Sequence, residues 1–313
     1  MLKADATLQL SPVVLFCSYN GSRYLANQLD SILGQRNYSP FVVISDDGST
    51  DDTSTLLQHY ATNHPAVIWR SGPAQGFVRN FFSLINDASI TNEYFALSDQ
   101  DDIWEPDHLA RALARLTEVP AEIPVLYASR TRLIDATGCP IGWSPHHPRQ
   151  PSFQNALIQN IASGNTMVFN RAARDLLAKL GAHAMPVWHD WALYQVVTAC
   201  GGQVFYSQEP TVLYRQHGNN AIGAQWTLAS RWHRIRKLLQ ARFRDWNTKN
   251  LQALEGIAEH MTPENRALMA RFAEVRQRRT PWGRVIGLYQ LGLYRQTRLG
   301  QLGLYVAAFF KLM

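Results

Sequence analysis

The chain has 313 residues, 46% of them hydrophobic, and is long enough to bury a sizeable core as one large domain or as a domain with an appendage. Its three scattered cysteines form no CxxC pair, which argues against a disulfide framework or a zinc site and for a reducing compartment. No basic leader opens the chain and no run approaches the ~18 apolar residues that a membrane span needs, so we expect neither secretion nor a transmembrane helix.

The positive charge of the chain is concentrated near its C-terminus. Residues 1–220 carry 14 basic and 19 acidic side chains, net −5, whereas residues 221–313 carry 16 and 5, net +11. A basic segment on a mildly acidic body usually meets a polyanion, either anionic lipid or nucleic acid.

Strands and helices alternate along the first part of the chain. Apolar and β-branched runs predict four strands, at 13–19, 41–47, 66–71 and 94–99. The intervening segments predict helices around Leu25, Leu29 and Ile32, at 51–61 and at 77–88. This alternation predicts an α/β fold with a mostly parallel sheet flanked by helices, whose ligands lie beyond the carboxyl ends of the strands.

The second part of the chain predicts further elements. A helix opens at Pro106, and another at 190–200 is closed by Gly201 and Gly202. Strands are predicted at 124–129, 166–170, 203–207 and 211–216. After Asn220 the sequence becomes basic and aromatic, with helical patterns at 227–258 and 263–278 and an Arg-spaced aromatic stretch at 281–313.

Three carboxylates follow the strand at 94–99, in the stretch SDQDDIW. Asp99, Asp101 and Asp102 lie so close that they need a cation, a hydrogen-bonded turn or open water to remain ionised. Carboxylates at i and i+2 can share one Mg²⁺ or Mn²⁺, with phosphate and water as its other ligands. The alternative is a solvated loop whose aspartates cap the next helix.

A second acidic stretch, ISDDGSTDD at 44–52, follows another strand. A carboxylate on its Gly-Ser turn can accept a hydrogen bond from a ribose hydroxyl or a base N–H, although no GxGxxG fingerprint is present. The alternative is an Asx turn followed by a helix N-cap. The conjunction of both acidic stretches with CSYNG at 17–21 favours a nucleotide site.

Seven stretches together resemble a known family. VVLFCSYNGSRYLANQLDSIL, VVISDDGSTDDT, GFVRNF and YFALSDQDDIWEPDHL are similar, in order and spacing, to the nucleotide-binding half of family 2 glycosyltransferases with the GT-A fold. ASGNTMVFN, HDWAL and YRQHGNNAIG resemble the bacterial rhamnosyltransferase-like branch. The resemblance covers about residues 11–224. It implies a glycosyltransferase domain at 1–224, with a nucleotide-sugar half at 11–120 and an acceptor half at 121–224, followed by a helical region at 225–313.

The resemblance also implies roles for individual residues. Those on the donor side are Tyr19 and Asp47 at the base, Arg79 near the phosphates, and Asp99 with Gln100 near the ribose or metal. Asp101 would be the principal protein ligand of Mg²⁺ or Mn²⁺, and His217 would be a second ligand. Imidazole binds Mn²⁺ better than it binds Mg²⁺. Cys17 is a departure, because many relatives have Thr or Ser there, and it puts base recognition in doubt.

Asp190 of HDWAL would be the general base, and the alternative is that it caps the helix that it begins. On the acceptor side the resemblance places Gly164 and Asn165 in a loop near the donor sugar. Trp188, His189 and Trp191 form an aromatic platform for a saccharide or are part of the core. One base opposite the leaving group predicts a single, inverting displacement.

The basic tail favours a membrane surface over nucleic acid, since no nucleic-acid motif accompanies it. Trp232, Ile235, Leu239, Phe243 and Trp246 approximate one helix face that can lie on anionic lipid or pack against the domain. We therefore expect a peripheral enzyme on the cytoplasmic face of the membrane that transfers L-rhamnose from dTDP-rhamnose to a lipid-linked saccharide during surface polysaccharide synthesis. The alternatives are a UDP-hexose or UDP-HexNAc donor, and a non-catalytic nucleotide-sugar or membrane scaffold protein.

Overall fold

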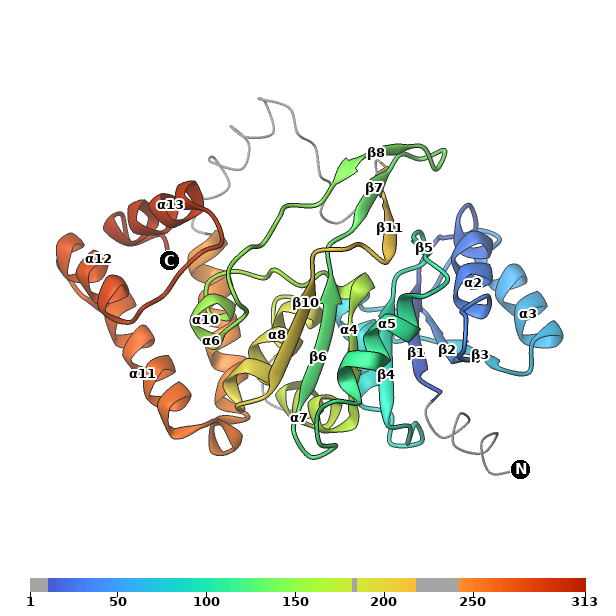
Figure 1. The fold of residues 1–313 in the computed structure, drawn as a ribbon, viewed down its shortest axis with the longest axis horizontal. Helices are drawn as coiled ribbons and strands as arrows, with labels where there is room; N and C mark the ends of the chain where they lie inside the picture. Colours follow the sequence, from blue (N-terminus) through green and yellow to red (C-terminus); the bar gives the residue numbers. More distant parts are fainter. Residues whose placement is uncertain (1–10, 182–184, 218–241) are drawn as a thin grey trace.

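A seven-stranded sheet forms the centre of the computed structural model, which describes residues 11–181, 185–217 and 242–313 (Figure 1). The strand order is β10-β6-β9-β4-β1-β2-β3. In chain order the strands are β1 (Val13–Ser18), β2 (Phe41–Asp46), β3 (Val67–Ser71), β4 (Tyr94–Ser98), β6 (Val125–Ser129), β9 (Val168–Asn170) and β10 (Gln203–Ser207).

Every pairing in this sheet is parallel except those of β9, which runs antiparallel to both β4 and β6. The expected mostly parallel sheet is therefore confirmed. The reversal of β9 was not predicted, because a short buried hydrophobic run has the same pattern in either direction.

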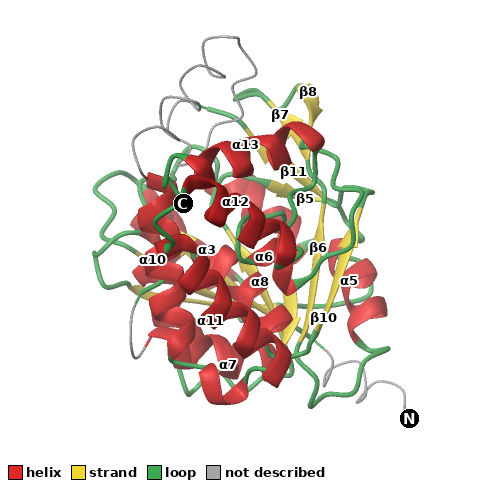
Figure 2. Cartoon of the chain, turned by 90° about the vertical axis from the view of Figure 1, so that its left-hand side faces the viewer, coloured by secondary structure: helices red, strands yellow, loops and turns green. Residues whose placement is uncertain are grey.

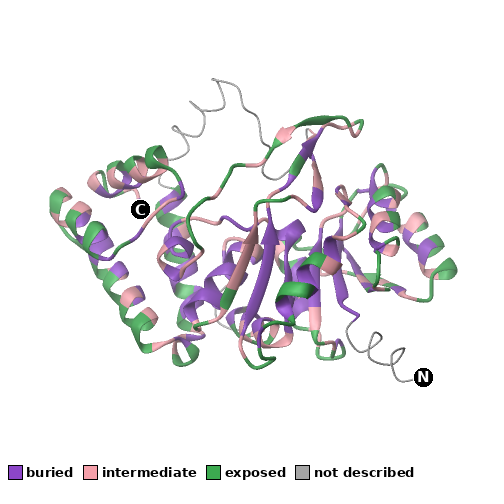
Figure 3. Cartoon of the chain, viewed as in Figure 1, coloured by how far each residue is buried: buried purple, intermediate pink, exposed green. Residues whose placement is uncertain are grey.

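The alternation of side chains along β1 divides the core into two layers. Val13, Leu15 and Cys17 face one cluster, whereas Val14 and Phe16 face the other. The first cluster is covered by α4 (Phe77–Ile85), α7 (Arg171–Gly181) and α8 (His189–Ala199), and the second by α2 (Leu25–Leu33), α3 (Thr53–Asn63) and α5 (His108–Leu116). Figure 2 shows α5 on one side of the strands and α7 and α8 on the other, and Figure 3 shows the central strands β1, β4, β6 and β9 as mostly buried.

A second, four-stranded sheet, of order β5-β11-β7-β8, lies beyond the carboxyl ends of the main strands (Figure 1). Its strands are β5 (Ile103–Trp104), β7 (Arg132–Ile134), β8 (Pro140–Trp143) and β11 (Val212–Arg215). Only β11 was predicted, as 211–216. β7 and β8 form a hairpin whose turn is held by Asp135, which accepts hydrogen bonds from the N–H groups of Thr137 and Cys139.

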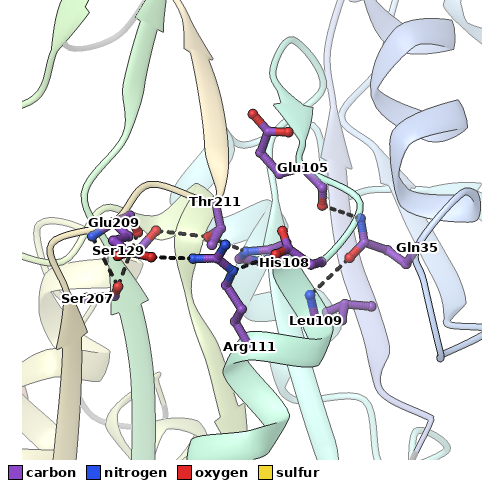
Figure 4. Close-up of polar contacts among 10 residues, drawn as sticks. Gln35, Glu105, His108, Leu109, Arg111, Ser129, Ser207, Glu209 and Thr211 are labelled. Carbon is purple, nitrogen blue, oxygen red and sulfur yellow. Dashed lines mark hydrogen bonds and ion pairs between the residues drawn. The ribbon is translucent and has the colours of Figure 1, made fainter.

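A network of hydrogen bonds holds the start of β11 against the segment that follows Asp102 (Figure 4). Thr211 shares hydrogen bonds with His108 (2.7 Å) and Ser129 (3.0 Å), and its carbonyl accepts one from the N–H of Glu105. Burial lowers the pKa of His108 to about 3, so the imidazole is neutral. Gln35 binds both the Glu105 carbonyl and the Leu109 N–H. The ends of β5 and β11 are thus held in register.

The C-terminal helices follow one another away from α7 and contribute to the same core cluster. They are α10 (Arg242–Glu255), α11 (Pro263–Gln277), α12 (Pro281–Gln290) and α13 (Arg298–Phe309). Short helices α6 (Phe153–Ala156), η1 (Gly164–Thr166) and η2 (Ala258–His260) complete the described fold.

Of the predicted helix at 227–258, residues up to 241 lie outside the described part, as do Trp232, Ile235 and Leu239. Phe243 is buried and Trp246 is half-buried against the domain. Within the described ranges no helix is long and apolar enough to cross a membrane.

Candidate active site

A cavity of about 730 Å³ lies beyond the carboxyl ends of β1, β2 and β4, where the α/β pattern predicts a ligand site. One wall is formed by Cys17 to Tyr19, Asp47 and Asp99 to Asp101. Gly164 and residues 188–190 at the start of α8 form another part of the lining. Segments about 90 residues apart along the chain thus line one cavity.

The structure brings together most of the residues predicted for the site. Those that line the cavity are Tyr19, Asp47, Asp99, Gln100, Asp101, Gly164, Trp188, His189 and Asp190. Four predicted residues do not line it: Arg79 is exposed on α4, Asn165 and Trp191 are buried, and His217 lies outside the lining. His217 reaches the site through its contact with Asp101.

Tyr19 is held in place through its backbone. The Gln100 side chain accepts a hydrogen bond from the Tyr19 N–H (2.7 Å) and donates one to the Tyr19 carbonyl (2.8 Å). The ring itself is 56% exposed and is therefore available to a ligand. A Cβ atom on Gly21 would lie 2.1 Å from the Gln100 Oε1 atom, so the Asn-Gly turn after β1 needs glycine for this amide to approach.

The acidic segment after β2 forms a hydrogen-bonded turn and also places a carboxylate in the cavity lining. Asp46 forms the turn, because its carboxylate accepts hydrogen bonds from the Ser49 N–H and hydroxyl and from the Ser18 hydroxyl. Asp47 lines the cavity and accepts a hydrogen bond from the Gly76 N–H at 2.7 Å. The N-cap of α3 is Asp52, whose side chain makes no capping hydrogen bond.

Asp101 and His217 meet at the edge of the cavity, with 2.7 Å between Asp101 Oδ2 and His217 Nε2. Their side chains are 18% and 16% exposed. Within the described part of the chain no group of three or more His, Cys, Asp or Glu is arranged to hold a metal ion. One carboxylate and one imidazole beside an open cavity nevertheless fit Mn²⁺ or Mg²⁺ that takes its remaining ligands from phosphate and water.

Asp99 is half-buried and lines the same cavity. Burial, together with the negative charges of Asp101 and Asp190, raises the pKa of its carboxyl to about 7. Burial and the nearby charges of Asp99 and Asp47 likewise raise the pKa of the Cys17 thiol, so this departure from the family pattern is a neutral side chain in the cavity wall.

Asp102 has a role that the sequence did not reveal. Its buried carboxylate accepts hydrogen bonds from Asn165 Nδ2 (2.6 Å) and from the Arg215 N–H (3.0 Å). The Arg215 side chain donates in turn to the carbonyl of Asp101. Asp102 therefore joins the acidic loop to η1 and to the strand that leads to His217. The helix N-cap here is Asp107, so the three clustered aspartates do not cap α5.

Asp190 projects from the first turn of α8 into the cavity wall. The N-cap of this helix is Trp188, so the capping alternative for Asp190 is wrong. Burial raises the pKa of Asp190 to about 6, although hydrogen bonds from the N–H groups of Trp191 and Gly164 and from Asn160 oppose the shift. A carboxyl with this pKa is a proton acceptor near neutral pH.

Aromatic rings line the cavity around Asp190. Trp188 stacks on Phe77 with 5.3 Å between ring centroids, and His189 stacks on Phe81 at 3.9 Å. Both ring nitrogens of His189 are buried without a hydrogen-bond partner. Trp191 instead donates to the Ala156 carbonyl inside the core, whereas Trp188 and His189 line the cavity with Phe77. Phe77 was missed because a residue at the start of a helix has no distinctive sequence signal.

Comparison with known proteins agrees with this geometry. The model of the family described as glycosyl transferase family 2 matches residues 13–177, more than half of the chain. The dTDP-rhamnosyl transferase RfbG of Shigella flexneri is 27% identical over 252 residues, which cover 76% of this chain and 83% of RfbG. The putative teichuronic acid biosynthesis glycosyltransferase TuaG of Bacillus subtilis is 24% identical over 237 residues, covering 74% and 89%.

Two solved structures share the fold. The mannosyltransferase PcManGT from Pyrobaculum calidifontis, in complex with GDP-Man and Mn²⁺, superposes with a TM-score of 0.51 at 19% identity, covering 96% of this chain and 86% of its own. S. aureus TarS 1-349, in complex with UDP-GlcNAc, gives a TM-score of 0.56 at 14% identity, covering 96% and 88%. The chain therefore belongs to glycosyl transferase family 2, has the GT-A fold and is a glycosyltransferase.

Proposed function

We propose that the chain catalyses an inverting, metal-dependent transfer of a sugar from a nucleotide donor to a saccharide acceptor. The observation that carries the proposal is the position of Asp190, which lies in the wall of the same cavity as Asp101 and its partner His217. A proton acceptor and a candidate metal site thus share one space that is large enough for a nucleotide sugar.

The donor is held by the wall at the ends of the strands. Tyr19, fixed through Gln100, and Asp47 contact the nucleotide, and Asp99 faces the ribose. Asp101 and His217 hold a divalent cation, which when bound neutralises charge on the diphosphate leaving group. Arg79 lies outside the cavity lining, so its side chain would have to change conformation to contact the phosphates.

The acceptor enters from the side of α8. Asp190 takes the proton from the attacking hydroxyl, and its raised pKa suits this role at neutral pH. Trp188 and Phe77 offer flat apolar faces to a sugar ring beside Asp190. Gly164 allows this approach, since a Cβ atom there would lie 3.0 Å from His189 Nε2 and 3.2 Å from Asp190 Cβ.

The donor that we propose is dTDP-rhamnose, and the acceptor is a growing surface polysaccharide on a lipid carrier. The names of RfbG and TuaG, a rhamnosyl transferase and a polysaccharide enzyme, support this choice. The basic C-terminal region supports a peripheral position on the cytoplasmic face of the membrane, where a lipid-linked acceptor is accessible.

A thermal-shift titration tests the proposal. The purified chain is titrated with dTDP-rhamnose, UDP-glucose, UDP-galactose, UDP-GlcNAc and GDP-mannose, each with and without Mn²⁺. We expect dTDP-rhamnose to raise the melting temperature in the presence of Mn²⁺, because a ligand that binds only the folded state stabilises it. The shift should disappear in Asp101→Ala and persist in the control Asp175→Ala, which removes a 54% exposed carboxylate on α7. A larger shift with another donor would contradict the choice of rhamnose, and equal shifts in Asp101→Ala would contradict the metal site.

A further inference from the structure

The last two helices present an apolar stripe to solvent. On α12 the exposed side chains Trp282, Ile286 and Tyr289 follow i, i+4, i+7 spacing, which places them on one helix face. On α13 and the residue after it, Leu299, Leu302, Val306 and Phe310 are exposed with similar periodicity. These seven side chains, here called the α12–α13 face, include Leu299 at 83% and Tyr289 at 74% exposure.

The α12–α13 face is not needed to build the fold. The opposite sides of the two helices already pack inward through Leu288, Leu304 and Ala308. The buried Arg284 joins the helices, donating to the carbonyls of Ala308 and Phe309 at the end of α13. Because the pair is complete without its outer face, the exposed apolar groups require another explanation.

The segment that carries this face has basic side chains and no acidic ones. Glu274 is the last acidic residue of the sequence, so residues 275–313 contain none. The same segment carries exposed Arg278, Arg279, Arg298 and Lys311. Apolar side chains that include Trp and Tyr, bordered by cations, match the boundary between the headgroups and the acyl chains of an anionic bilayer.

We propose that the α12–α13 face is the surface by which this protein docks on an anionic lipid bilayer. Its helices have 10 and 12 residues, about 15 to 18 Å, and would lie in the membrane plane because they are too short to span it. A second copy of the chain fits less well, since a symmetric contact would bring the same cations together without any carboxylate between them. The proposal depends on the proposed function in one respect only, which is that docking would bring the active site near a lipid-linked acceptor.

Figure 1 places α12 and α13 at one end of the molecule and β2 and β3 toward the other. This arrangement provides matched controls for a vesicle co-sedimentation experiment with the full-length chain. The vesicles contain equal parts of phosphatidylcholine and phosphatidylglycerol, and a second set is pure phosphatidylcholine. The apolar test variant is Trp282→Ser with Leu299→Ser, and its control is Phe41→Ser with Ile68→Ser, exposed residues of β2 and β3.

A second pair of variants tests the charge. Arg279→Gln with Arg298→Gln removes two cations next to the face, and the control Arg70→Gln with Arg115→Gln removes two exposed cations elsewhere. We expect each test variant to bind the mixed vesicles at least about tenfold more weakly than its control, and the wild type to prefer mixed over neutral vesicles. Far-UV circular dichroism and the melting temperature check that all variants fold.

Equal vesicle binding by a test variant and its control would overturn the proposal. So would a wild-type dimer that dissociates in the apolar variant while vesicle binding is unchanged, because the face would then belong to a second copy. Donor-induced thermal shifts are measured on the same samples. They should be equal in all four variants, so a failure of donor binding is distinguished from a failure of docking.

Discussion

Replacing Asp190 by Asn should stabilise the protein while removing its activity. Desolvation in the folded structure raises the pKa of this half-buried carboxyl from 3.8 to about 6. Each unit of pKa shift corresponds to about 1.4 kcal/mol, so the ionised form costs about 3 kcal/mol of folding free energy. Because the folded state binds the proton more tightly than the unfolded state, stability falls as the pH rises from about 4 to about 6, and the full cost is present above that range.

The neutral amide introduced by this substitution avoids the cost. Its oxygen can still accept the hydrogen bond of the Trp191 N–H, but the amide has one acceptor atom fewer than the carboxylate. We therefore expect Asp190→Asn to gain between about 1 and 3 kcal/mol at pH 7.5 and almost nothing near pH 4. Transfer activity should fall by about 10² to 10⁴, the range for loss of a general base.

Urea denaturation of the metal-free protein at the two pH values measures the free energy of unfolding. The control is Asp245→Asn, which removes an exposed carboxylate from the first turn of α10 and should cost less than about 1 kcal/mol. The reasoning is refuted if Asp190→Asn is less stable than the wild type at pH 7.5, or if its gain is the same at both pH values.

Further substitutions test the supports of the site. Asn165→Ala should lower the free energy of unfolding by about 1 to 3 kcal/mol, because it deprives the buried Asp102 of a 2.6 Å hydrogen bond; urea denaturation measures this, and an unchanged midpoint would show that the contact is dispensable. Gln100→Ala should weaken nucleotide binding without unfolding the protein, because Tyr19 loses two backbone restraints; calorimetric titration with donor measures this, and unaltered affinity would remove Tyr19 from the donor site. Gly164→Ala should lower kcat more than it raises KM of the donor, since the added methyl group displaces the first turn of α8; a change in KM alone would place the effect on the donor side.

The central strands and the polar residues at their ends could be predicted from the sequence. The strands that became β1, β2 and β4 are short apolar runs bounded by turn residues, and the carboxyl ends of parallel strands meet at one edge of a sheet. Tyr19, Asp47 and Asp101 consequently line one cavity, as expected. Local pattern was sufficient here because each of these side chains lies within three residues of the end of its strand.

Features that depend on long-range packing could not be predicted in this way. Whether a carboxylate such as Asp102 is solvated or buried depends on Asn165 and Arg215, which lie far away in the sequence. The β7–β8 hairpin was missed because its strands are very short, although Asp135 and the positive φ of Gly138 form a recognisable turn signal. The contact of Trp191 with the core likewise depends on the packing of α6 against α8.

The most direct test compares donor binding with sugar transfer in variants of the site. Donor binding is measured by calorimetric titration in the presence of Mn²⁺, with the donor that stabilises the protein. The structure-based account predicts that Asp190→Asn binds this donor as tightly as the wild type but does not transfer the sugar. It predicts that Asp101→Ala loses both donor binding and transfer. Full transfer by Asp190→Asn, or metal-dependent donor binding that survives in Asp101→Ala, would contradict the assignment of acceptor and donor chemistry to the two walls of this cavity.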